Sequence, residues 1–288
     1  MAMNENRRMR ARGFRRFLVE DGIRHLVLAP LALLIVFPIA WMVLTSLKPS
    51  AETVLWPPRM LPQAPTLQNY REVFLRWPFL RFFLNSLLIS GVSTVMILLT
   101  SSSAGYAFAK IKSRAMNAIF FIFIATIIVP FESYMIPVYL LVNRLGWLDS
   151  YPGLILPFII MAFGVFFMRQ TIQAIPDELI QAARIDGCSE FAIFWRMILP
   201  LSVGPLSALA IYAFLNVWGF FTWPLIITNT QEMYTTEIGL ALFQSQFFIE
   251  YGLVAAGATV TALPLLLVFF VFQRRIITAV TLTGLKGT

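Results

Sequence analysis

Six long apolar runs dominate the 288-residue sequence and leave few folds open to it. A membrane-spanning helix needs about 20 mostly apolar residues, because the hydrocarbon core is roughly 30 Å thick and a helix rises about 1.5 Å per residue. Six segments meet this requirement: about 26–47, 83–109, 117–142, 153–172, 198–227 and 252–273. They lack the alternation of a barrel strand, and lipid cannot satisfy an open backbone. The sequence therefore predicts an all-α integral membrane protein with six transmembrane helices.

The composition agrees with a protein whose solvent is the bilayer. Only 12% of the residues are charged, whereas a soluble domain usually carries about 25%. The net charge of +8 would be compatible with a protein that binds nucleic acid, but the basic residues lie at the ends of the apolar runs. That pattern is typical of membrane topology and of anionic lipid headgroups, so we expect contact with membrane lipid and no nucleic acid. A single cysteine, Cys188, excludes an internal disulfide and a cysteine-based metal cluster, and no metal site is predicted.

The distribution of Lys and Arg predicts the orientation. If the N-terminus is cytoplasmic, 16 of the 22 Lys and Arg residues lie in cytoplasmic segments, as the positive-inside rule requires. This gives a basic cytoplasmic segment at 1–25, a transmembrane domain at 26–273 and a cytoplasmic tail at 274–288, with both termini inside. The first apolar run is longer than a signal-peptide core and no small-residue cleavage site follows it, so we interpret it as an uncleaved first span.

A polar loop at about 173–197 interrupts the apolar pattern on the cytoplasmic side, and its polar stretch runs from Asp177 to Pro200. Asp177 and Glu178 place negative charge at the positive end of a helix dipole. Spacings of three and four residues put one set of side chains on a common face: Leu179, Ala182, Ala183 and Asp186. The two alanines leave that face nearly without side chains, and Gly187 permits the backbone reversal that ends a helix. The segment is then either a surface that another protein approaches closely or an ordinary amphipathic loop at the lipid surface.

The same loop resembles the EAA signature of permease subunits of ATP-binding-cassette (ABC) importers. In the signature, Glu-Ala-Ala is followed by three residues, Gly, nine residues and Ile-x-Leu-Pro. This sequence has Gln181-Ala182-Ala183, Gly187 and Met197-Ile198-Leu199-Pro200 at that spacing. The resemblance implies a coupling helix that docks into a cleft of a separate ATPase subunit. The residues to which it assigns this role are Glu178, Gln181, Ala182, Ala183, Asp186, Gly187, Leu199 and Pro200. Gln181 departs from the usual Glu and removes a charge from the contact.

Further stretches resemble the carbohydrate branch of these permeases, in the manner of the second permease of maltose-type and glycerol-phosphate-type systems. They are "SLKPS", "TLQNYREVF", "NSLLIS", "AGYAFAK", "IPVYLLVNRLGWLDSYPGLILP" and "QRRIITAVTLTGLKG". The resemblance implies the type I ABC importer architecture, in which this chain forms half of the translocation path for a sugar or sugar-like solute. It also implies four kinds of partner: a second permease in a heterodimer, two copies of an ATP-binding subunit that bind ATP and Mg, an extracytoplasmic solute-binding protein and lipid. The expected location is the cytoplasmic membrane of a bacterium or archaeon.

Polar and aromatic groups within the apolar runs are candidates for the substrate path. Glu132 and Tyr134 lie in the third run, and charged groups at membrane depth usually face a protein interior or a water-filled path. The alternative for Glu132 is a contact between subunits or a position at the outer interface. Asn216, Trp218 and Trp223 lie in the fifth run and suit stacking on, or hydrogen bonding to, a sugar. Trp223 is equally suited to the outer aromatic belt.

The sequence does not predict an enzyme. It contains no G-x-x-x-x-G-K-[ST] phosphate-binding loop, so we expect no cofactor and no ATPase site in this chain. The alternative is an ion-gradient-driven secondary transporter or channel subunit, which needs a coupling-ion site in the membrane and often shows inverted repeats. Glu132 is the only acid at that depth, and no internal repeat is evident. The solute itself is left open among mono- and oligosaccharides, other polyols and glycerol-phosphate-type solutes.

Overall fold

Helices joined by loops account for the part of the chain that the computed structural model describes, namely residues 25–26, 28–244 and 250–284. No β-strand occurs among these residues, so the all-α prediction is confirmed. The predicted basic segment 1–25, apart from His25, and the last four residues of the predicted tail lie outside the described residues. After the helix Leu28–Ser46, the elements are α2 (Ser50–Thr53), α3 (Gln68–Arg76), α4 (Phe79–Lys110), α5 (Arg114–Ala125), η1 (Thr126–Ile128), α6 (Phe131–Arg144), α7 (Tyr151–Ile155), η2 (Leu156–Phe158), α8 (Ala162–Gln173), α9 (Asp177–Ile185), α10 (Glu190–Ile193), η3 (Phe194–Ile198), α11 (Leu199–Leu201), α12 (Val203–Trp218), α13 (Thr222–Ile227), η4 (Gln231–Met233), α14 (Thr236–Leu242) and α15 (Tyr251–Gly284).

Three of the predicted spans are continuous helices, and three are bent. Among the described residues, Leu28–Ser46, Phe79–Lys110 and Tyr251–Val271 are each long and apolar enough to cross a membrane. Three helix pairs pass the same test together: Arg114–Ile128 with Phe131–Arg144, Tyr151–Phe158 with Ala162–Gln173, and Glu190–Leu201 with Val203–Trp218. The bends measure 103°, 46° and 80° respectively. Six spans result if each bent pair counts as one.

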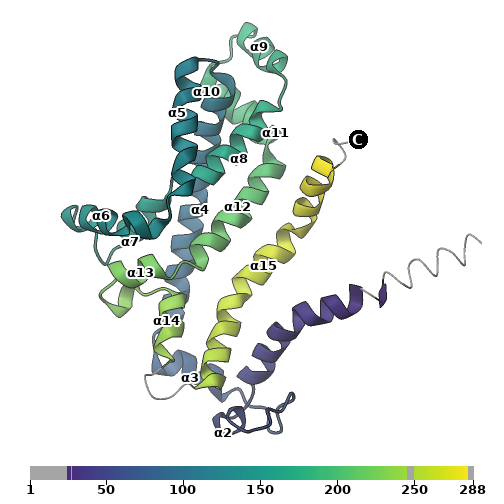
Figure 1. Cartoon of the computed structure of the whole chain (residues 1–288), viewed down its shortest axis with the longest axis vertical. Coiled ribbons are helices and arrows are strands. Elements are labelled where there is room, and N and C mark those ends of the chain that lie inside the picture. Colours follow the sequence, from purple (N-terminus) through teal and green to yellow (C-terminus); the bar gives the residue numbers. More distant parts are fainter. Residues whose placement is uncertain (1–24, 27, 245–249, 285–288) are drawn as a thin grey trace, which may run out of the picture. The chain divides into compact units, whose positions relative to one another are not determined.

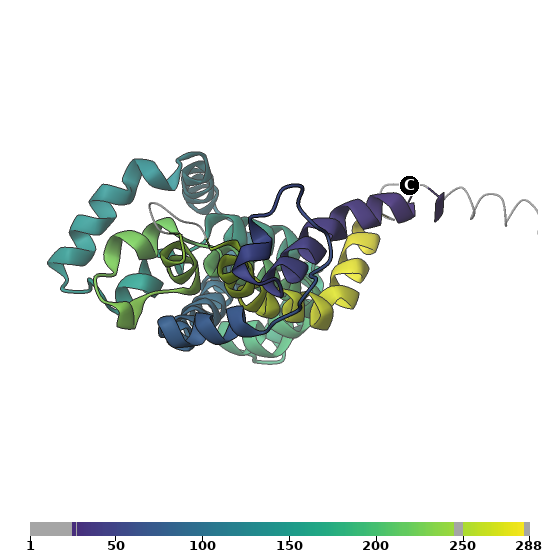
Figure 2. The same cartoon turned by 90° about the horizontal axis from the view of Figure 1, so that it is seen from below.

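Proline and glycine explain where the predicted continuous runs are broken. The third run stops at Val129 because the following Pro130 disfavours a helical backbone there, and α6 leaves in a new direction (Figures 1 and 2). The predicted fifth span, 198–227, was wrong as a single helix. Its main helix α12 ends at Trp218 with Gly219 as the C-cap, and α13 is a separate short helix.

The chain divides into two compact units, which we describe separately. The first contains residues 1–73 and 247–259. Within it, the buried Asn69 amide donates hydrogen bonds of 2.8 Å to the carbonyl oxygens of both Ser46 and Lys48. The Lys48 ammonium lies 4.6 Å from the centre of the Trp41 ring and donates to the carbonyl of Arg59. These polar contacts fix the loop that follows the helix Leu28–Ser46.

The second unit, residues 74–246 and 260–288, is built on three packed helices. Helix α4 lies against both α8 and α12 (Figure 1). A Cβ atom at Gly105 would stand 2.8 Å from the Cβ of Met168 and 2.9 Å from the backbone nitrogen of Arg169. Only glycine therefore lets α4 and α8 approach this closely, as is common between membrane helices.

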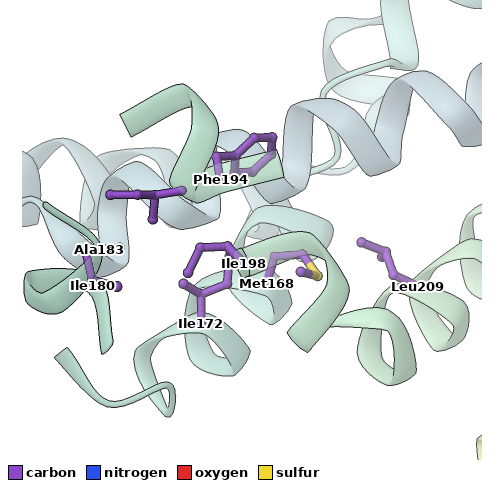
Figure 3. Close-up of a cluster of buried hydrophobic side chains, with 8 residues drawn as sticks. Met168, Ile172, Ile180, Ala183, Phe194, Ile198 and Leu209 are labelled. Atoms are coloured by element: carbon purple, nitrogen blue, oxygen red, sulfur yellow. The ribbon is translucent and has the colours of Figure 1, made fainter. Parts of the chain in front are cut away.

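Two hydrophobic clusters lie within this second unit. The first, called here the α9 core cluster, joins α8, α9, α10, η3 and α12 (Figure 3). Its buried members are Met168, Ile172, Ile180, Ala183, Ile193, Phe194, Ile198 and Leu209. The second cluster contains Ile89, Val142, Leu154, Ile155, Trp223, Ile227 and Met233. The α9 core cluster seats the polar loop on the membrane helices.

Candidate functional site

The polar loop forms the predicted short helix, α9, followed by a defined turn. At Gly187 the backbone has φ +80°, a conformation that L side chains rarely adopt. The Cys188 N–H donates to the carbonyl of Ala183 (2.9 Å), and the Gly187 N–H donates to that of Arg184 (3.1 Å). This pair of bonds is the Schellman motif that ends helices at a left-handed glycine. Ser189 then caps α10 by accepting from the Ala192 N–H, so the chain reverses within a few residues.

The two alanines of the signature face opposite environments, which corrects one prediction. Ala182 is exposed, as expected, and shares the outer surface of α9 with Glu178 and Gln181. Ala183 was expected on the same open face, but it is only 8% exposed and belongs to the α9 core cluster. The physical reason is the three-residue spacing from Ile180, which puts both side chains on the inner stripe of the helix (Figure 3). The small side chain of Ala183 therefore fits into the buried α9 core cluster.

Apolar side chains are exposed on this loop, where solvation alone would favour polar ones. Ile185 is 86% exposed, and Leu179, Phe191 and Trp195 are exposed as well. The rings of Phe191 and Trp195 lie with their centres 5.9 Å apart. Together with Ala182 these four residues make up what we call the exposed patch. Asp186 and Gly187 are also exposed.

An ion-pair network fastens the beginning of α9 to the end of α4. The Lys110 ammonium donates to Asp177 Oδ1 (2.8 Å) and to the carbonyl of Ile175 (2.6 Å), while Lys112 donates to Asp177 Oδ2. The two lysines differ in environment, since the Lys110 side chain is 5% exposed and that of Lys112 is 76% exposed. Hydrogen bonds from Lys110 and Lys112 lower the pKa of Asp177 to about 2. Asp177 therefore stays ionised, and the network stays intact, throughout the physiological pH range.

A second polar contact fastens α10 to the same helix. Glu190 accepts from the Tyr106 hydroxyl on α4 and from the Arg184 guanidinium on α9, at 2.6 Å each. Both helices of the loop are thus tied to the last turns of α4. Sequence reasoning missed Tyr106, Lys110 and Lys112 as parts of this site. They lie within or just after the stretch "AGYAFAK", which contributed only to the family resemblance. More than 60 residues separate Lys110 from Asp177, so no local pattern connects the two.

The end of the signature lies where the loop returns to the membrane. Leu199 and Pro200 belong to α11, directly after the π-helical turn η3. The Leu199 N–H donates to the carbonyl of Phe194, five residues back, and Pro200 has no N–H with which to continue an α-helical ladder. The chain then bends by 80° into α12. These two residues shape the turn, and Pro200 is exposed while Leu199 is half-buried.

A cavity of about 620 Å³ lies between α4, η1, α6, η2, α12 and α13. Three of the five predicted path residues line it: Tyr134, Asn216 and Trp223. Trp223 is fully buried, and its indole N–H donates to the carbonyl of Gly153 (3.0 Å). The structure therefore brings together a tyrosine of the third run with an amide and an indole of the fifth.

The other two predicted path residues lie outside the lining of this cavity. Glu132 is exposed in the first turn of α6. Trp218 is buried and packs its ring against Phe83 and Phe214, with ring centres 5.6 and 5.5 Å away. Trp218 is therefore a packing residue of α12 in this structure.

Comparison with protein families gives one match that covers more than half of the chain. Residues 96–281 match the family described as "Binding-protein-dependent transport system inner membrane component". The matched range contains the polar loop. It also contains every residue that lines the cavity except four on α4: Ser86, Ile89, Ser90 and Ser93.

Two curated relatives match over nearly the whole length of the chain. The arabinooligosaccharides transport system permease protein AraQ of Halalkalibacterium halodurans is 37% identical, and the match covers 89% of this chain and 93% of the relative. The lactose transport system permease protein LacG of Rhizobium radiobacter is 31% identical over 89% and 92% of the two chains.

The fold also matches a solved structure. A chain in the crystal structure of a bacterial ABC transporter involved in the import of the acidic polysaccharide alginate superimposes with a TM-score of 0.77. The match covers 89% of this chain and 96% of that chain, at 22% sequence identity. The importer-permease architecture that the sequence predicted is confirmed.

Proposed function

The chain belongs to the family of binding-protein-dependent transport system inner membrane components, and we propose that it carries a sugar or sugar-like solute as one half of a two-permease path. Family membership makes it a multi-pass inner-membrane permease subunit of an ABC importer, and therefore a transport subunit rather than an enzyme. The alternative of an ion-gradient-driven transporter or channel subunit is set aside on the same ground.

The observation that carries the sugar assignment is the near full-length similarity to permeases named for sugars. Both relatives are named for oligosaccharide or disaccharide transport, and each match spans about nine-tenths of both chains. The aromatic and hydroxyl side chains of the cavity support a solute with both apolar and hydroxyl surfaces.

We further propose that α9 passes movement between the membrane helices and a separate ATPase subunit, present in two copies, which binds ATP and Mg. The exposed patch supports this role, because apolar side chains exposed on a cytoplasmic loop mark a protein contact. The eight residues of the signature divide between two tasks in this proposal. Glu178, Gln181, Ala182 and Asp186 offer the docking surface, and Ala183, Gly187, Leu199 and Pro200 hold its shape. The remaining proposed partners are a second permease and an extracytoplasmic binding protein.

Most Lys and Arg residues lie in the segments that share one side of the membrane with the N-terminus. This distribution supports a cytoplasmic position for the polar loop and for both termini. The proposed domain organisation follows from it: a cytoplasmic segment at 1–25, the permease domain at 26–273 and a cytoplasmic tail from 274, with α15 continuing as a helix to Gly284.

Reconstituted transport tests this function. Proteoliposomes that contain both permeases, the ATPase and the binding protein are expected to accumulate radiolabelled lactose or arabinotriose only when ATP is enclosed. Vesicles with a hydrolysis-deficient ATPase serve as the control. Accumulation driven by an ion gradient without ATP would overturn the proposal.

A further inference from the structure

Two residues that line the cavity carry buried hydroxyl groups without a hydrogen-bond partner among the described residues. Ser90 on α4 is 1% exposed and Thr235 is 5% exposed, and both line the cavity. Neither hydroxyl oxygen has a hydrogen-bond partner among the described residues. A buried hydroxyl without a partner is costly, so such groups usually mark a place where another molecule completes the bond.

Ser90 differs from three other hydroxyl residues of its helix. Further along α4, Ser102, Ser103 and Thr100 each donate to the carbonyl four residues before them, at 2.6 to 2.9 Å. That bond is the ordinary way for a serine or threonine in a membrane helix to satisfy its hydroxyl. Ser90 does not make it, and neither do Thr94 and Ser101 of the same helix. Of these three residues only Ser90 lines the cavity.

Thr235 shows the same behaviour at a helix end. It stands at the N-cap of α14, where a threonine hydroxyl commonly accepts from the first backbone N–H groups. In this structure its side chain makes no such capping bond, and it lines the cavity. The N-terminus of α14 is satisfied differently, since the Thr236 N–H donates to Ser86 Oγ at 2.9 Å.

The cavity has two chemically different walls. On α4, Ser86, Ser90 and Ser93 follow one another at four- and three-residue spacing and all line the cavity. Four aromatic residues form the other wall: Phe131, Phe158, Phe220 and Trp223. The rings of Phe131 and Phe158 make edge-on contacts with each other and with both other rings, at 5.1 to 5.9 Å between ring centres. A sugar ring has the complementary surface, with hydroxyl groups at its rim and apolar C–H groups on its faces.

None of the described residues that line the cavity carries a charge. Bringing a carboxylate or phosphate into such surroundings costs several kcal/mol unless an opposite charge or several donors compensate it. An uncharged solute avoids this cost. The lining therefore discriminates against acidic sugars and sugar phosphates.

We propose that this permease itself binds the solute in this cavity, that Ser90 and Thr235 hydrogen-bond its hydroxyl groups, and that the solute is an uncharged sugar. The proposal rests on the proposed function as a sugar permease and narrows it to neutral saccharides. Binding places the C–H face of a sugar ring on the aromatic wall and its rim against the serine stripe.

Transport kinetics of the reconstituted importer test this proposal, with lactose, arabinotriose and a trisaccharide of galacturonic acid as probes. Ser90→Ala and Thr235→Val each remove one hydroxyl with little change in volume, and we expect each to raise the KM for the transported neutral sugar about fivefold. Ser90→Thr keeps the hydroxyl and is expected to restore a KM close to that of the unmodified protein. The acidic trisaccharide is expected not to be transported.

Ser101→Ala is the matched control for a loss of stability. Ser101 lies on the same helix, is fully buried and also lacks a hydrogen-bond partner among the described residues, but it does not line the cavity. We expect its replacement to leave KM unchanged. An equal rise in KM for Ser101→Ala and Ser90→Ala, an unchanged KM in the double variant Ser90→Ala/Thr235→Val, or transport of the acidic trisaccharide would overturn the proposal. The sugar-permease function fails separately, if the unmodified importer accumulates no saccharide with ATP.

Discussion

Replacing Ala182 by phenylalanine is expected to abolish ATP-driven uptake while the permease remains folded in the membrane. Ala182 is exposed on the outer surface of α9, beside Ile185 and Leu179 of the exposed patch. A phenyl ring there has room in the isolated chain but would hold a docked ATPase away from the helix. The measurement is uptake by reconstituted importer, together with recovery of the ATPase on affinity-purified permease. We expect uptake to fall at least tenfold and the ATPase to be lost.

The neighbouring residue supplies a contrasting control. Ala183→Phe introduces a ring into the α9 core cluster, where overpacking costs about 1–3 kcal/mol. It should therefore lower the thermal midpoint of the detergent-solubilised permease, whereas Ala182→Phe should leave that midpoint unchanged. Full uptake by Ala182→Phe would show that the outer surface of α9 does not bind the ATPase.

Replacing Lys110 by glutamine is expected to uncouple ATP hydrolysis from uptake. Lys110 is the buried member of the pair of lysines that holds Asp177, and it also donates to the carbonyl of Ile175. Hydrogen bonds to a charged group are stronger than those between neutral groups, so their loss should free the first turn of α9 from the end of α4. Movement of the ATPase would then displace the loop without moving the membrane helices. We expect uptake to drop severalfold more than the ATPase activity of the reconstituted complex.

Lys112→Gln is the matched control for this prediction. Lys112 bonds the same carboxylate, but its side chain is largely exposed, and ion pairs exposed to solvent contribute little to stability. Its replacement should leave the ratio of uptake to ATP hydrolysis nearly unchanged. Equal effects of the two substitutions, or a normal ratio in Lys110→Gln, would contradict a role of the network in coupling.

The spans were predictable from the sequence because burial in lipid requires long apolar runs, and the runs are visible by length alone. Their bends were harder to predict. Pro130 marks the 103° turn between α5 and α6, but Pro264 lies within the continuous helix α15. A proline alone does not decide between a break and a tolerated position, because neighbouring helices can support the freed backbone groups.

The loop was predictable from its residues only in part. The Pro-Asp-Glu beginning and Gly187 at the end gave the helix and its turn, because caps act within a few residues. The orientation of Ala183 was predicted incorrectly because both alanines fit a small-residue face, and only the burial of Ala183 with Ile180 in the α9 core cluster distinguishes them. The contacts of Lys110 with Asp177 and of Tyr106 with Glu190 join distant parts of the chain, and no local pattern encodes them.

The cavity shows the same division between local pattern and tertiary structure. Asn216 and Tyr134 were predictable because polar groups are rare in apolar runs and usually face a protein interior or a water-filled path. Ser90 was not found, since a serine in a membrane helix ordinarily bonds its own backbone. Only the structure shows that this bond is missing and that Thr235, 145 positions later in the chain, lines the same cavity.

Cross-linking from the native Cys188 measures most directly whether the α9–α10 turn contacts an ATPase. This cysteine is the only one in the chain and is exposed next to Gly187. Inverted vesicles that contain the whole importer are treated with a membrane-impermeant maleimide that carries a photoreactive group and reacts with the Cys188 thiol. The Cys188→Ser variant is the control. We expect illumination to link the permease to the ATPase subunit of the same importer, and we expect right-side-out vesicles not to be labelled. Two results would contradict a contact between this turn and the ATPase: labelling of Cys188 in right-side-out vesicles, or labelled permease that forms no cross-link to the ATPase on illumination.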